Sequence, residues 1–129
     1  MAIGPGDTFL LTRGTGTTPH LWVLLWGPAG AARAFLAVYL TTLRSHSDRT
    51  CILAAGEHPF IHHDTAVAYG EVQRWPEDRL QQLITEGVAK PRQPVSAALL
   101  DRLRAGFFAS PRTPHAMVEM ARKEFGADS

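Results

Sequence analysis

Histidines crowd one short stretch of this sequence, in a segment with the composition of a loop. The stretch "CILAAGEHPFIHHDTAVAYG" carries His58, His62 and His63 within six positions, next to Asp64. His46 lies shortly upstream, in "LRSHSDRTC". An imidazole has a reference pKa of about 6.5, so it can transfer protons near neutral pH or bind a metal ion. The stretch is therefore a candidate site whose chemistry depends on what the fold brings beside it.

Two other loops carry hydroxyls and cations that suit phosphate chemistry. These are "TRGTGTTPH" (12–20) and "TTLRSHSDR" (41–49), whose polar side chains include Arg13, His20, Thr41, Thr42, Arg44, Ser47 and Arg49. Cleavage of RNA through its own 2′-hydroxyl needs a base, an acid, and donors for the phosphorane oxygens, with no metal. Arginine matches a phosphate with a two-pronged fork of N–H groups. All three residue types are present, but their spacing alone does not bring them together.

The histidines allow two other interpretations. His46, His58, His62 and Asp64 could supply nitrogen and oxygen ligands to zinc or iron. However, "HPFIHHD" is not a spaced metal-binding signature, and Pro59 predicts a loop without fixed ligand geometry. The same residues could also form a solvated turn, with a histidine ring fastening a neighbouring carbonyl.

The composition indicates an ordinary globular protein of one domain. The 129 residues include 45% hydrophobic and 19% charged ones, and 13 basic against 12 acidic side chains give a net charge of +1. Nucleic-acid binding would therefore need a local basic patch. The single Cys51 excludes an internal disulfide and a cysteine-based zinc cluster. No signal-peptide pattern or span of about 20 apolar residues is present, so we expect a cytoplasmic protein outside the membrane.

The elements that must position these loops change character near residue 75. Before it come short β-rich runs separated by turn residues: Thr8–Thr12, His20–Trp26, Ala34–Leu40, Thr50–Ala54 and Ala66–Arg74. After it, helical periodicity predicts helices that begin near Pro76, after Ser96 and at Thr113–Pro114. We predict an α+β fold in one domain, 1–129. A small, strongly bent antiparallel barrel (1–75) would be followed by two or three packed helices (76–129).

The order of these segments resembles the MazF/PemK-like toxin family, small SH3-like barrels that cleave RNA in toxin–antitoxin pairs. The similarity lies in "GDTFLLT", "PHLWVLLW", "AVYLTTL" and "TAVAYGEVQRWPEDRL", which together cover roughly residues 6 to 84. Each motif is weak, and their shared order carries the resemblance. It implies a metal-independent endoribonuclease without cofactors, with single-stranded RNA as substrate and a cognate antitoxin protein as partner. A homodimer is compatible with it.

The resemblance also implies roles for individual residues. The family's catalytic Thr corresponds to Thr41, with Thr42 as the register-shifted choice. Its catalytic Arg stands just before the second strand, where this chain has His20 and the nearest Arg is Arg13. Proton transfer then falls to His20 or to the histidine cluster, or else the chain has kept the barrel and lost the cleavage.

Together these arguments give one set of expected roles. Thr41 and Arg44 would contact the scissile phosphate, with His46 or His20 as the base and His58 or His62 as the acid. The expected RNA-binding residues are Arg13, Thr42, Ser47, Arg49 and His63. The alternatives are a non-catalytic module that binds a partner protein or RNA on the same barrel, and a metal-dependent hydrolase that uses the histidines.

Overall fold

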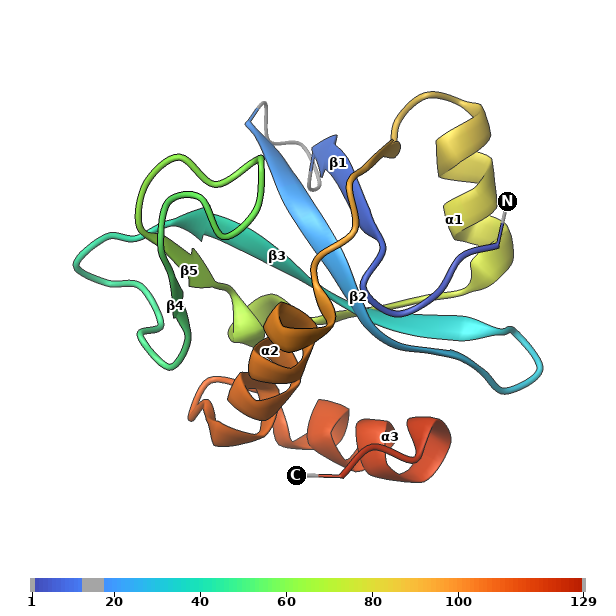
Figure 1. Cartoon of the computed structure of the whole chain (residues 1–129). Helices are drawn as coiled ribbons and strands as arrows, with labels where there is room; N and C mark the ends of the chain where they lie inside the picture. Colours follow the sequence, from blue (N-terminus) through green and yellow to red (C-terminus); the bar gives the residue numbers. More distant parts are fainter. Residues whose placement is uncertain (1, 13–17, 129) are drawn as a thin grey trace.

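A computed structural model of the chain describes residues 2–12 and 18–128. Its described part is α+β, with one antiparallel sheet and three α-helices (Figure 1). The strands are β1 (Thr8–Thr12), β2 (Pro19–Ala29), β3 (Ala34–Thr42), β4 (Ile52–Leu53), β5 (Thr65–Val67), β6 (Gln73–Trp75) and β7 (Lys90–Arg92). The helices are α1 (Glu77–Thr85), α2 (Ala97–Ala109), α3 (His115–Phe125) and a short 3₁₀ turn, η1 (Tyr69–Glu71).

The sheet is covered on both faces, which explains why β2 reads as an unbroken apolar run. Successive strand side chains point to opposite faces. Leu21 and Val23 accordingly join a core cluster with α2 and α3, whereas Trp22 and Leu24 join a second cluster with Leu80 of α1. Figure 1 shows α1 on one side of β2 and β3, and α2 and α3 on the other.

Strand β3 carries the central pairing of the sheet. One edge pairs along its length with β2. The other edge pairs with β6 near the start, at Phe35–Ala37, and with β5 near the end, where Thr41 faces Ala66 and Thr42 faces Thr65. The end of β3 therefore lies beside β5, and the loops that adjoin both strands meet there. This is where the predicted polar loops come together.

The expected closed barrel is not shown. The hydrogen-bonded path runs β4-β5-β3-β2-β1-β7, with β6 also on β3, so in the described residues β4 and β7 form the two ends of an open sheet. The predicted run Ala66–Arg74 is divided into β5, η1 and β6. Strand β7 was not expected from "KPRQP", and it pairs with β1.

The predicted helices are present, with one difference at a cap. Ser96 accepts a hydrogen bond from the Leu99 amide at 3.1 Å and caps α2 as expected. Helix α3 has Pro114 at its N-cap position, and the Thr113 hydroxyl donates instead to the Phe107 carbonyl at 2.7 Å. No helix in the described ranges is long and apolar enough to cross a membrane.

Candidate functional site

Two adjoining cavities open where β3 ends. The first, the His46 cavity, has a volume of about 360 Å³; the second, the His62 cavity, has about 460 Å³. Thr41, Thr42 and Arg44 line both. The His46 cavity also takes in Tyr39, His46, Ser47, Asp48, Glu71 and Arg112, and the His62 cavity takes in His20, Phe60, Ile61, His62, His63 and Thr65. The fold thus brings His20, the polar residues from Thr41 to Asp48, and His62 and His63 to one place.

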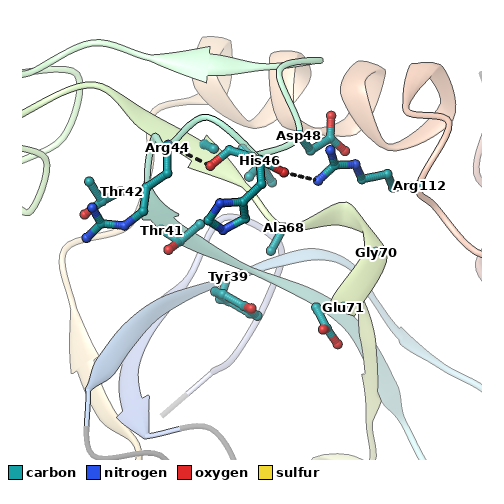
Figure 2. A pocket seen from close by; sticks show the side chains of 13 residues that line it. Tyr39, Thr41, Thr42, Arg44, His46, Asp48, Ala68, Gly70, Glu71 and Arg112 are labelled. Atoms are coloured by element: carbon teal, nitrogen blue, oxygen red, sulfur yellow. Dashed lines mark hydrogen bonds between the residues drawn. The ribbon is translucent and has the colours of Figure 1, made fainter.

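The partition between the cavities comes from the last residues of β3 and the turn that follows. Thr41 and Thr42 are half-buried and held by strand pairing to β5. Directly after them, the Arg44 amide donates to the Ser47 hydroxyl at 2.8 Å, and the Ser47 amide donates to the Arg44 carbonyl at 3.1 Å. This tight turn sets the direction of the chain at Arg44. In Figure 2 the Arg44 side chain extends past Thr42, away from His46.

His46 lies in the first cavity. In Figure 2 its ring lies beside Thr41 and above Tyr39, among the lining residues. Its backbone carbonyl accepts a hydrogen bond from Nη1 of Arg112 at 2.8 Å. Arg112 belongs to the connection between α2 and α3, so the C-terminal helices help to hold the loop that carries His46.

Asp48 is the second attachment of this loop to the helices. Its carboxylate is 7% exposed and accepts from the Ser110 hydroxyl and, at 2.9 Å, from the Thr50 amide. Burial alone would raise the pKa of Asp48. The hydrogen bonds from Ser110 and Thr50, together with the charge of Arg112, outweigh burial and lower this pKa below its ordinary value. Asp48 therefore anchors the loop by accepting hydrogen bonds on both carboxylate oxygens.

His20 lies in the second cavity, on the side of β2. Its Nδ1 lies 3.3 Å from the Leu40 carbonyl oxygen. Its ring packs on the Tyr39 ring in a tilted arrangement, with 4.5 Å between the ring centroids. Because a carbonyl oxygen only accepts, Nδ1 carries the hydrogen in the contact with Leu40, which leaves Nε2 as the nitrogen that can take up a proton. His62 and His63 are exposed and line the same cavity.

His58 lines a third, more open cavity together with His62. It is 4% exposed and lines neither of the first two cavities. Its Nε2 lies 2.6 Å from the Gln93 carbonyl, and its Nδ1 accepts from the Phe60 amide at 3.0 Å. Both ring nitrogens are thus engaged with the backbone. The ring therefore fastens the loop to the backbone, and the role of His58 as an acid stays a prediction.

The remaining predicted residues are divided. Ser47 and Thr42 line the His46 cavity, whereas Arg49 is exposed and lines neither cavity. Arg13 lies outside the described residues. In the two described ranges, no three His, Cys, Asp or Glu side chains are grouped to hold a metal ion.

Sequence reasoning missed four polar residues of the His46 cavity: Tyr39, Asp48, Glu71 and Arg112. Tyr39 lies in the apolar run "AFLAVYL", where nothing in the pattern distinguishes it from a core residue. Arg112 is 63 positions beyond Arg49 in the chain, and the only signal for it was a cation between two prolines in "SPRTP". Comparisons of this chain with protein-family models, with curated proteins and with solved structures found no match.

Proposed function

We propose that this protein is a metal-independent endoribonuclease that cleaves single-stranded RNA, acting as the toxin of a toxin–antitoxin pair. One observation supports this most directly. Thr41, Thr42 and Arg44 lie between two cavities that each hold imidazole side chains. A phosphate bound at this partition would have a candidate base on one side and a candidate acid on the other.

The proposed reaction uses the substrate's own nucleophile. The 2′-hydroxyl oxygen attacks the adjacent phosphorus as a base removes its proton, and the bond from phosphorus to the 5′-oxygen breaks. An acid gives that leaving oxygen a proton. The products are a 2′,3′-cyclic phosphate and a 5′-hydroxyl, so atoms and charges balance without a metal or oxidant.

The residues divide these roles by position. The Thr41 hydroxyl and the Arg44 guanidinium are donors for the phosphate oxygens, whose negative charge grows in the transition state. His46 is the proposed base in its own cavity. His62 is the proposed acid in the second cavity, where His20 is the alternative base. His58 is left out of this assignment because both its ring nitrogens contact backbone groups.

The family resemblance supports the biological part of the proposal. An SH3-like identity of the open sheet and an antitoxin partner rest on that resemblance. A cytoplasmic location rests instead on the sequence pattern, which shows no signal-peptide pattern and no apolar span of about 20 residues. A short reading frame beside the gene would be the expected source of the antitoxin. If expression of this chain arrests growth and co-expression of that reading frame relieves the arrest, this part of the proposal is supported. If expression of the chain causes no growth defect, this part is opposed.

The activity is tested with purified protein and mixed single-stranded RNA in excess chelator. We expect the wild type to cleave, and Thr41→Ala and His46→Ala to lose about 100-fold or more of the rate. His115→Ala is the matched control, because that histidine is exposed at the start of α3 and lines neither cavity. Intact RNA with the wild type, or full activity in both variants, would refute the proposal.

A further inference from the structure

An exposed phenylalanine stands at the rim of the His62 cavity. Phe60 is 40% exposed, although burying an apolar ring away from water is favourable. The other exposed large hydrophobic residues among those described are Ile52 and Val88, and neither lines the two cavities. Phe60 is therefore an apolar ring held in solvent next to the candidate phosphate site.

The loop around Phe60 is fixed by the buried His58. The Phe60 amide donates to Nδ1 of His58, and the opposite ring nitrogen contacts the Gln93 carbonyl at 2.6 Å. The Ile61 amide donates to the His58 carbonyl at 2.9 Å, and the Gly56 amide donates to the Ile61 carbonyl at 2.9 Å. These bonds hold the backbone of an exposed apolar residue in one position. The exposure of Phe60 is therefore a fixed feature of a hydrogen-bonded loop.

The cavity beside Phe60 has the chemistry that a nucleobase requires. Leu40 and Ile61 give it buried apolar walls, at 4% and 3% exposure. The hydroxyls of Thr42 and Thr65 add groups that can hydrogen-bond to base edges. Proteins that bind single-stranded nucleic acids stack bases on phenylalanine and histidine rings.

We propose that the His62 cavity is a nucleobase subsite in which a base next to the scissile phosphate stacks on Phe60. The proposal rests on the proposed function, which puts that phosphate at Thr41 and Arg44, the residues that both cavities share. It also specifies the substrate, because a base enters such a cavity only when it is unpaired and unstacked.

The test measures binding without cleavage. The probe is a fluorescent random-sequence RNA hexanucleotide in which 2′-fluoro groups replace the 2′-hydroxyls and so remove the nucleophile. A series carries one abasic nucleotide at each position in turn. One base removal should weaken wild-type binding by about 5- to 100-fold, the range for a single stacked base. Phe60→Ala should weaken binding of the intact probe by a similar factor. The variant should then bind the intact probe and the probe that lacks that base with the same affinity.

Two variants control for indirect effects. Phe60→Trp keeps a ring for stacking and should bind within a few-fold of the wild type. Val88→Ala removes a comparably exposed apolar side chain, 45% exposed, that lines neither cavity, and should change nothing. The inference would be overturned if Phe60→Ala bound the intact probe as tightly as the wild type does. It would also be overturned if the abasic position weakened Phe60→Ala by the same factor as the wild type, because the two losses would then be independent. A wild type that binds with this coupling but leaves natural RNA intact would support the base subsite and refute the proposed cleavage.

Discussion

The attachment of the His46 loop to the helices can be tested by removing one hydroxyl. Ser110→Ala deletes one donor to the buried carboxylate of Asp48, which keeps its hydrogen bonds from Thr50. It also removes the acceptor of the Arg112 amide. A hydrogen bond to a charged group contributes about 1.5–3 kcal/mol. Both side chains are 7% exposed, so water replaces the lost donor poorly. We expect the free energy of unfolding to fall by about 2 kcal/mol at pH 7.

The loss should depend on pH with a definite sign. The pKa of Asp48 is lower in the folded protein than its ordinary value, because the hydrogen bonds and the charge of Arg112 outweigh burial. The stabilisation from its ionised form is therefore complete above the ordinary aspartate pKa and disappears as the pH falls through the folded-state pKa. The difference between wild type and Ser110→Ala should shrink over that acidic window.

Urea denaturation followed by tryptophan fluorescence, at pH 7 and at successively lower pH, measures both effects. Ser45→Ala is the matched control, since Ser45 lies exposed in the same loop and, within the described residues, makes no hydrogen bond with its hydroxyl. A loss below about 0.5 kcal/mol at pH 7 would refute the reasoning. A loss of constant size down to acidic pH would do so as well, because it would not come from an ionised Asp48.

Three further predictions concern other parts of the molecule. Arg112→Ala removes the hydrogen bond to the His46 carbonyl, so kcat for RNA cleavage should fall several-fold while KM changes little. A change in KM alone would contradict this and indicate a role in substrate binding. Gly106→Ala would put a Cβ 2.1 Å from the Tyr69 hydroxyl oxygen and should lower the unfolding free energy by about 1–3 kcal/mol, whereas an unchanged urea midpoint would contradict this packing. Burial raises the pKa of the Cys51 thiol, so iodoacetamide at pH 8 should react with it slowly in the native protein and rapidly in urea; equal rates would contradict its burial.

The elements that the sequence predicts well are those whose side chains are buried in a regular pattern. The apolar runs of β1, β2 and β3, and the stripes of α1 and α2, bury side chains at the spacing that their structure requires. Strand β7 could not be predicted this way. Its residues Lys90, Pro91 and Arg92 are all exposed, and the segment is a strand only through its backbone pairing with β1.

The candidate site was predictable where its residues are close in the chain. Thr41, Arg44 and His46 lie within six positions of one another, and they do line one cavity. His58 was grouped with His62 because they are neighbours in sequence. Its ring is instead engaged by the Gln93 carbonyl, 35 positions away, and no local pattern reports such a contact.

The chemical nature of the RNA ends tests the central claim most directly. Wild-type protein is incubated with single-stranded RNA in excess chelator, and the fragments are mapped and their termini identified. Attack by the 2′-hydroxyl predicts 5′-hydroxyl and 2′,3′-cyclic phosphate ends, with cleavage lost in Thr41→Ala. Intact RNA, or fragments that carry 5′-phosphates, would contradict the account.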